Sequence, residues 1–110
     1  MGMTFSFIVT SWNIEDYISS CLHSLAACLR PGDQLIIVDD GSDDRTCEEI
    51  EACFDMLSSR GADILSVFLG TNTQGGVGIP ANIGLAEATG EAIFVVDGDD
   101  FASTVAVEVA

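Results

Sequence analysis

Basic side chains are scarce in this sequence, which has no lysine and three arginines against 18 acidic residues. The formal net charge is -15 at pH 7. Such a chain repels the phosphates of nucleic acids and of anionic membranes, so we expect neither as a partner. A phosphate-bearing ligand has to be held by backbone amides, helix N-termini or a divalent cation. The shortage of positive charge therefore limits the ways in which this chain can hold any phosphate-bearing ligand.

Long apolar runs and paired cysteines are also missing. No run approaches the roughly 20 residues that a membrane-spanning helix requires, and the N-terminus lacks the basic start of a signal peptide. The four cysteines form no Cys-x-x-Cys pair and have no histidine at zinc-finger spacing. We interpret Cys21 and Cys28 as small buried hydrophobes of a reduced protein. The expected location is cytoplasmic, and a parent protein at the cytoplasmic face of a membrane stays open.

Short apolar runs with the length of strands alternate with helical patterns along the chain. With 110 residues, of which 48% are apolar, it suffices for one domain with a single core, covering 1–110. The expected strands are 5–10, 35–38, 64–69 and 92–96. Alternation of strands with helices predicts an α/β fold with a mainly parallel sheet and helices on both faces.

The expected helices have apolar residues at spacings of three and four. They cover residues 14–29, 46–61 and about 80–89. Thr46 and Glu49 have the spacing of a capping box at the start of the second helix. Pro80 suits the first turn of the third helix, and Gly90 its end. The expected buried face of the second helix consists of Cys47, Ile50, Phe54 and Leu57.

Polar residues follow three of the expected strands. They are Thr10 to Asn13, Asp39 to Ser42, and Asp97 to Asp100. Ligands of parallel sheets bind beyond the carboxyl ends of the strands, so we expect these segments to meet around a ligand. Three carboxylates within residues 97–100 repel one another unless a cation lies between them. Their hard oxygens suit Mg²⁺ or Mn²⁺, which shares its remaining ligand positions with water and substrate phosphates.

Several of these features also have a structural interpretation. Asp43 and Asp44 can cap a helix N-terminus, where negative charge is favourable. The Gly75-Gly76 pair can form a plain turn instead of a phosphate-binding loop. Trp12 can anchor the core or stack on a flat base. Asp40 lies at the strand end itself, opposite a second acidic cluster, which favours a ligand-binding role.

Taken in order, these segments resemble the motifs of family two, GT-A type, inverting glycosyltransferases. The segments are Thr10-Ser11-Trp12-Asn13, VDDGSDD at 38–44 with Thr46, Gly75-Gly76 with ANIGL at 81–85, ATGE at 88–91 and VVDGDD at 95–100. The resemblance extends from Phe5 to Asp100. It implies the Rossmann-like GT-A half that binds a nucleotide-diphosphate sugar, commonly a UDP-sugar. The acceptor in that family is a hydroxyl of a glycan, lipid or protein.

The resemblance also implies roles for individual residues. Asp40 accepts a hydrogen bond from the base, Trp12 stacks on or flanks it, and Thr10 lines the same pocket. Asp97 and Asp99 match the DxD motif. The donor site then comprises Thr10, Trp12, Asn13, Asp39, Asp40, Gly75, Gly76, Asn82, Asp97 and Asp99. The implied ligands of Mn²⁺ or Mg²⁺ are Asp97, Asp99 and Asp100.

Two departures from the family pattern matter. Ala81 stands where the family commonly has the arginine of Ala-Arg-Asn, so a basic residue near the donor is missing. The sequence also ends ten residues after Asp100, before the family's acceptor site and catalytic base. We therefore expect a donor-binding half truncated before the acceptor half, with no catalytic residue of its own and little turnover. We also expect self-association through the sheet edge left uncovered.

Two other functions fit part of the pattern. An aspartate pair after an apolar strand also resembles the site of aspartate-based phosphoryl-transfer domains, although those depend on a lysine. Acidity alone fits a non-catalytic domain that binds divalent cations or a protein partner. Metal binding of the same affinity with and without a nucleotide would distinguish this last function from that of a glycosyltransferase.

Overall fold

The computed structural model describes residues 2–76, 78–99 and 106–109. Its sheet has the strand order β3-β2-β1-β4-β5. The parallel strands are β1 (Phe5–Ser11), β2 (Gln34–Asp39), β3 (Asp63–Phe68) and β4 (Ala92–Asp97). The four strands expected from the sequence are therefore confirmed. A further strand, β5 (Ala106–Val109), pairs antiparallel with β4 and was not predicted.

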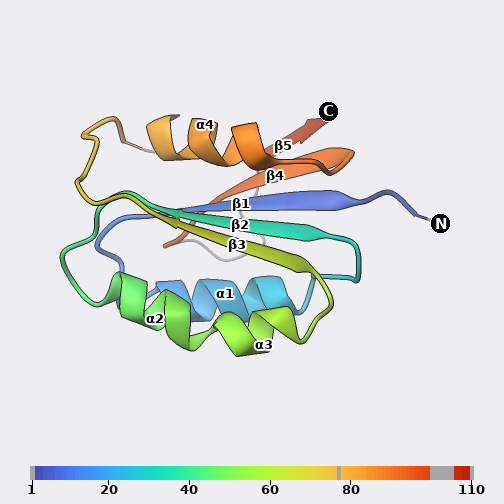
Figure 1. Cartoon of the computed structure of the whole chain (residues 1–110), viewed down its shortest axis with the longest axis horizontal. Coiled ribbons are helices and arrows are strands. Elements are labelled where there is room, and N and C mark those ends of the chain that lie inside the picture. The colour runs from blue at the N-terminus through green and yellow to red at the C-terminus, as the bar shows by residue number, and fades with distance from the viewer. Residues whose placement is uncertain (1, 77, 100–105, 110) are drawn as a thin grey trace.

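Helices cover both faces of this sheet (Figure 1). One face carries α1 (Ile18–Ala26), α2 (Thr46–Ala52) and α3 (Phe54–Ser58), and the other carries α4 (Gly78–Glu87). The α/β architecture inferred from the alternating pattern is thus confirmed. Strands β3 and β5 form the two edges of the described sheet. Self-association through an edge stays a prediction.

The central strand β1 is buried on both faces. Phe7 and Val9 belong to the apolar cluster beneath α1, α2 and α3, whereas Ile8 belongs to the cluster beneath α4. Ile8 and Val9 are fully buried. Complete burial of a side chain of this size stabilises the fold by about 1.5 to 3 kcal/mol. A continuous apolar run is therefore the sequence that this position requires.

Helix α4 lies close against β1 because Gly84 has no side chain. A Cβ atom at Gly84 would overlap the side chain of Ile8. Pro80 lies in the first turn of α4, as predicted, where its missing N–H costs no helical hydrogen bond. The helix begins at Gly78 and ends at Glu87, two residues earlier at each end than the sequence indicated.

The first helix is shorter than its apolar pattern. Residues 14–29 were predicted helical, but α1 covers only Ile18–Ala26. Ile14 precedes it in a turn, with its carbonyl accepting the N–H of Ile18 at 3.0 Å. The prediction that Cys28 is buried is wrong, because Cys28 follows the end of α1 and is exposed. Cys21 is buried, and all four cysteines are free thiols.

The second predicted helix is divided into α2 and α3 at Cys53. The Cys53 N–H donates to the carbonyl of Ile50, three residues back, at 3.1 Å. This tighter turn rotates the buried face, so Cys53 packs in the core and Phe54 is 38% exposed. Burial of Phe54 was therefore a wrong prediction. Ile50 and Leu57 are buried as expected.

The expected capping box is also absent. The residue before α2, Arg45, makes no side-chain hydrogen bond to the first turn of the helix. The Thr46 hydroxyl instead accepts the N–H of Ile14 at 2.9 Å and donates to Asp44. Asp44 also accepts the Thr46 N–H at 2.9 Å, so its structural interpretation is confirmed. In the part of the chain that the structure describes, no helix has the length and apolar character needed to cross a bilayer.

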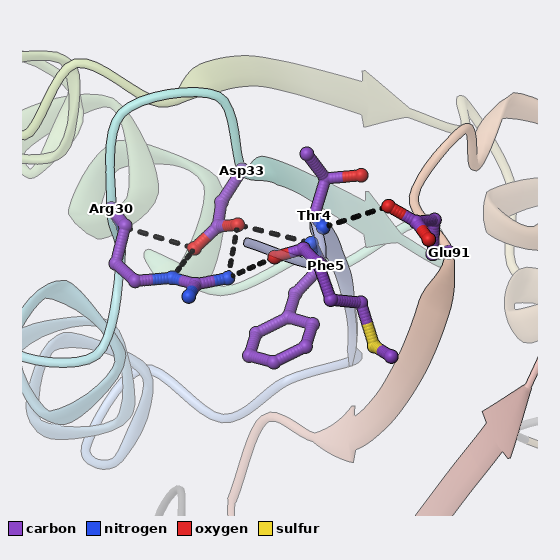
Figure 2. A network of polar contacts seen from close by, with 6 residues as sticks. Thr4, Phe5, Arg30, Asp33 and Glu91 are labelled. Carbon is purple, nitrogen blue, oxygen red and sulfur yellow. Dashed lines mark hydrogen bonds and ion pairs between the residues drawn. The ribbon is translucent and has the colours of Figure 1, made fainter. Parts of the chain in front are cut away.

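A buried carboxylate fixes the chain where β1 and β2 begin (Figure 2). Asp33 is 1% exposed and accepts the backbone N–H of Phe5 at 3.0 Å and that of Arg30 at 3.0 Å. The Arg30 guanidinium donates to both oxygens of Asp33 at 3.1 Å. It also donates to the Met3 carbonyl at 2.6 Å and lies 4.3 Å from the centre of the Phe5 ring. This network joins the starts of two neighbouring strands.

Two opposing effects act on the pKa of Asp33. Burial raises it, whereas hydrogen bonds from the Arg30 side chain and from the amides of Phe5 and Arg30, together with the Arg30 charge, lower it. The result is a pKa below the ordinary value of 3.8. Because the folded-state pKa is lowered, ionised Asp33 stabilises the fold above the unfolded-state pKa. That contribution disappears as the pH falls through the folded-state pKa.

We expect Asp33→Asn to lower the free energy of unfolding by about 1 to 3 kcal/mol at pH 7, because two backbone donors and a guanidinium lose a charged acceptor. The matched control is Asp63→Asn, at an exposed position that begins β3. Urea titrations measure both. The difference between wild type and Asp33→Asn should shrink below about pH 4. A difference that stays constant between neutral and strongly acidic pH would contradict this account.

Candidate functional site

The loops that follow β1, β2 and β3 gather at one end of the sheet, at the left of Figure 1. A cavity of about 450 Å³ lies at this end. Several residues predicted from the sequence line it, namely Thr10, Trp12, Asp40, Gly76, Asp97 and Asp99. Its other lining residues are Ser11, Ile14, Asn72, Gln74 and Pro80. The carboxyl edge of the sheet therefore holds the cavity, as the fold class predicts.

The strand register brings these residues together. Thr10 lies between Val38 of β2 and Asp97 of β4. The Asp40 N–H donates to the Ser11 carbonyl at 2.8 Å, and the Gly98 N–H donates to the Thr10 carbonyl at 2.7 Å. Three strand ends are thus tied side by side. The side chains that follow them consequently surround one cavity.

Four predicted residues lie outside the cavity lining. Asn13 is exposed and holds the neighbouring turn, since its Oδ1 accepts the Asp43 N–H at 2.9 Å. Asp39 is fully buried and is not among the lining residues. Gly75 is next to the lining residue Gly76, and Asn82 is exposed on α4. Asp100, the third predicted metal ligand, lies outside the described residues.

Asp40 is 3% exposed and holds the loop that follows β3. Its carboxylate accepts the Thr73 N–H at 3.0 Å, the Thr73 hydroxyl at 3.0 Å and the Asn72 amide at 3.2 Å. The Asn72 amide also donates to the Asp40 carbonyl at 2.9 Å. Because two carboxylate oxygens offer about four lone-pair sites, one further donor can still be accepted. Asp40 thus joins the end of β2 to residues 71–74 and still faces the cavity.

The same loop depends on an unusual backbone approach. Gly41 has a φ of 75°, and a Cβ atom there would overlap the backbone of Thr71 and Asn72. Gln74 has a φ of 60°, and its N–H donates to Asn72 Oδ1 at 2.8 Å. Glycine at position 41 therefore allows the loop to lie directly against the end of β2. The loop in turn places Asn72 and Gln74 in the cavity wall.

Sequence reasoning missed Asn72 and Gln74. It treated the glycines at 75 and 76 as the ligand-binding feature of this loop. A usable signal was present, because the polar run from Thr71 to Gln74 follows β3 in the same way that the other polar segments follow β1 and β2. The rule that ligands bind at strand carboxyl ends applies equally to this third strand.

The Asp39 carboxylate is surrounded by four donors. Its Oδ1 accepts the hydroxyls of Ser11 at 2.8 Å and Ser42 at 2.6 Å. Its Oδ2 accepts the Ser42 N–H at 2.9 Å and the Cys47 thiol at 3.2 Å. Asp39 therefore connects the end of β1, the turn after β2 and helix α2. Its oxygens are occupied within the protein, which explains why it does not line the cavity.

Burial raises the pKa of the Cys47 thiol to about 12, with further contributions from its hydrogen bond to Asp39 and from nearby carboxylate charges. This pKa lies far above neutral pH, so the thiol form of Cys47 predominates at pH 8. Because the thiolate is the reactive form, this side chain is chemically inert near neutral pH.

The cavity lining contains polar groups but no cation. Asp40, Asp97 and Asp99 contribute carboxylates, and no arginine is among the described lining residues. Arg30 lies in the network at the opposite end of β2, and Arg45 pairs with Glu48 at 3.3 Å in solvent. Thr10 Oγ1 is buried without a hydrogen-bond partner. The described lining therefore combines carboxylates with neutral polar side chains and carries no positive charge.

The oxygen ligands available at the cavity can be compared with the coordination that a divalent cation requires. Asp97 and Asp99 are both exposed at the cavity and supply hard oxygens. Among the residues described, no three acidic, histidine or cysteine side chains are grouped to form a complete metal cage. Mg²⁺ normally uses one or two carboxylates and completes its coordination with water and phosphates. Two carboxylates beside an open cavity fit that requirement.

The fold is an α/β arrangement with a mainly parallel sheet and a cavity at the carboxyl ends of its strands. The chain belongs to glycosyltransferase family 2, since the model of the family Glycosyl transferase family 2 matches residues 6–109. The resemblance inferred from the motifs is thereby confirmed.

Particular relatives are informative. Poly(ribitol-phosphate) beta-N-acetylglucosaminyltransferase TarS of Staphylococcus aureus (strain Mu50 / ATCC 700699) is 38% identical over 101 residues, covering 90% of this chain and 17% of that protein. The crystal structure of S. aureus TarS 1-349 in complex with UDP-GlcNAc has a TM-score of 0.76 and 37% identity, covering 90% of this chain and 27% of that one.

A more distant structure shares the fold. Mannosyltransferase PcManGT from Pyrobaculum calidifontis, in complex with GDP-Man and Mn²⁺, has a TM-score of 0.73 at 21% identity, covering 88% of this chain and 28% of that one. The chain thus spans less than a third of the length of these relatives. The GT-A, Rossmann-like architecture expected from the sequence is confirmed by these neighbours.

We expect iodoacetamide at pH 8 to modify Cys28 first, because Cys28 is exposed while Cys21 and Cys53 are buried and Cys47 stays protonated. Intact-mass spectrometry should show one fast addition in the wild type. Cys28→Ser should slow the first addition at least about tenfold. Equally fast labelling of Cys28→Ser would show that Cys47 or another thiol is accessible and ionised.

Proposed function

We propose that this chain binds a nucleotide-diphosphate sugar, specifically a UDP-sugar, as the donor for transfer to a hydroxyl acceptor with inversion at the anomeric carbon. The observation that carries the proposal is the cavity at the carboxyl edge, which combines one exposed aromatic ring with carboxylates from two strand ends. TarS, a sequence relative, is an N-acetylglucosaminyltransferase and has been crystallised with UDP-GlcNAc. Family membership favours this function over phosphoryl transfer or simple cation binding.

Three residues are proposed to contact different parts of the nucleotide. Trp12 is 53% exposed in the cavity wall, which leaves its ring free to stack on a base. Asp40 has capacity for one further hydrogen bond, and an N–H of the base is a suitable donor. Thr10 lines the cavity between the ends of β2 and β4 and is proposed to contact the donor there.

Asp97 and Asp99 are proposed to hold Mn²⁺ or Mg²⁺, and Asp100 is proposed as a further ligand. When bound, the cation supplies Lewis-acid stabilisation of the charge on the departing diphosphate. With alanine at position 81 and no arginine in the described lining, that part of the cavity has no positively charged side chain to take the place of the cation. Carboxylates without a cation would repel the donor's phosphates. Donor binding is therefore expected to require the metal.

Inversion also requires a base within hydrogen-bond reach of the acceptor hydroxyl. We assign this base to no residue of the chain. The acceptor, a glycan, lipid or protein hydroxyl, and a cytoplasmic location both stay predictions. The proposed contribution of these residues is to position the donor and exclude competing orientations.

We expect UDP together with Mn²⁺ to raise the melting temperature, whereas UDP alone or Mn²⁺ alone should have little effect. At a ligand concentration ten times Kd, the stabilisation is about 1.4 kcal/mol, which corresponds to roughly 5 °C for a chain of this size. Thermal-shift assays with UDP and GDP, with and without metal, provide the measurement.

Asp99→Ala should abolish the shift because it removes a cation ligand, while the matched control Asp63→Ala removes an exposed carboxylate away from the cavity. Equal stabilisation by GDP and UDP would contradict the proposed donor. Full stabilisation by UDP in the presence of a chelator would contradict the proposed metal dependence.

A further inference from the structure

Trp12 is flanked on both sides by residues tied to one buried carboxylate. Ser11, immediately before it, donates its hydroxyl to Asp39 at 2.8 Å in a buried hydrogen bond. Asn13, immediately after it, donates its N–H at 2.9 Å to the Ser42 hydroxyl. That hydroxyl in turn donates to Asp39 at 2.6 Å. The backbone on either side of the exposed tryptophan therefore depends on Asp39.

The second connection also holds an unusual conformation. Asn13 has a φ of 49°, a left-handed value that is uncommon for a residue other than glycine. Its side chain accepts the Asp43 N–H at 2.9 Å, so two hydrogen bonds join Asn13 to residues 42–43. Such a conformation persists because its surroundings hold it. The Ser42 hydroxyl connects Asn13 to Asp39, because it accepts the Asn13 N–H and donates to the Asp39 carboxylate.

Asp39 itself is well placed to be rigid. It is 0% exposed, it ends β2, and it lies beside Ser11 in the strand register. A further donor, the Cys47 thiol at 3.2 Å, ties it to α2. Its position is thus fixed by the sheet and by a helix, whereas Trp12 lies in a loop. A rigid support of this kind limits the motion of the exposed aromatic ring before any ligand binds. Less conformational entropy is then lost on binding.

We propose that Asp39 is a positioning residue for the donor site, acting through Ser11 and Ser42 to hold Trp12 against the cavity without touching the ligand. This inference rests on the proposed function, because it takes the ligand of the cavity to be a nucleotide. It assigns to Asp39 a role distinct from the direct ligand contact expected from the sequence.

The test compares Asp39→Asn and Ser42→Ala with Asp33→Asn. Asp39→Asn places an amide donor among hydroxyl, thiol and backbone donors, and Ser42→Ala removes the connection to Asn13 while the Ser42 N–H bond to Asp39 remains. Asp33→Asn is the matched control, because it alters a buried carboxylate before β2 at the opposite end of the sheet. Thermal melts measure how far each variant is destabilised.

The first readout needs no ligand. Trp12 is the only tryptophan, so its fluorescence anisotropy and its quenching by acrylamide report the mobility of this one side chain. We expect Asp39→Asn and Ser42→Ala to lower the anisotropy and increase quenching, and Asp33→Asn to leave both as in the wild type. Unchanged fluorescence in Ser42→Ala and Asp39→Asn would overturn the inference. If Asp39→Asn does not fold, Ser42→Ala decides.

The second readout is the affinity for UDP with Mn²⁺, measured by calorimetry. We expect Kd to rise on the order of tenfold in Asp39→Asn and Ser42→Ala, the size of effect that supporting residues have around binding sites. Asp33→Asn should keep the wild-type Kd. If the wild type binds tightly and all variants have the same Kd, the inference about Asp39 is overturned and the proposed function is not. Failure of the wild type to bind UDP would instead overturn the proposed function, and the fluorescence would still decide whether Asp39 positions Trp12.

Discussion

The parallel register of β1 with its two neighbours is the constraint on which the rest of the structure depends. It places Thr10 between Val38 and Asp97, so that the residues following three strands emerge at one edge. Backbone hydrogen bonds continue past the strand ends, from Asp40 to Ser11 and from Gly98 to Thr10. A slip by one residue would turn the apolar set of β1 toward the wrong faces. Core packing and site geometry are therefore fixed by the same pairing.

The acidic residues of this chain fall into two environments. Asp33 and Asp39 are buried at opposite ends of β2 and have their oxygens occupied by donors from the protein. Asp97 and Asp99 are exposed at the cavity. Asp40 combines both conditions, since it is buried and holds the 71–74 loop yet lines the cavity. Net charge alone does not distinguish these environments, because they differ in burial and in position relative to the cavity.

The sequence predicted strands better than helices for a physical reason. A short continuous apolar run such as 35–38 is typical of a strand that is covered on both faces, and few other structures bury all of its side chains. Helix ends depend on local hydrogen bonds, and the break at Cys53 follows from a bond to Ile50 that no apolar spacing reveals. Exposure of Cys28 has the same origin, because it follows from where α1 ends.

For the site, strand ends identified Thr10, Asp40 and Asp97. The polar run after β3 gave the same kind of signal, but which of its side chains reach the cavity depends on tertiary contacts such as those of Asp40 with Asn72 and Thr73. The sequence could not reveal that four protein donors surround the oxygens of Asp39, because these contacts form only in the folded chain.

The close approach at Gly41 has a consequence for how this domain can diversify. The backbone of Gly41 lies directly against that of Thr71 and Asn72, so the first part of the 71–76 loop has no room to bulge. Asp40 pins the same part through Thr73. We therefore expect changes of length after Thr73, where Gln74 and Gly76 line the cavity, to be tolerated better than changes at residues 71–73. Evolution can reshape that wall by insertion or deletion while the sheet beneath keeps its pairing.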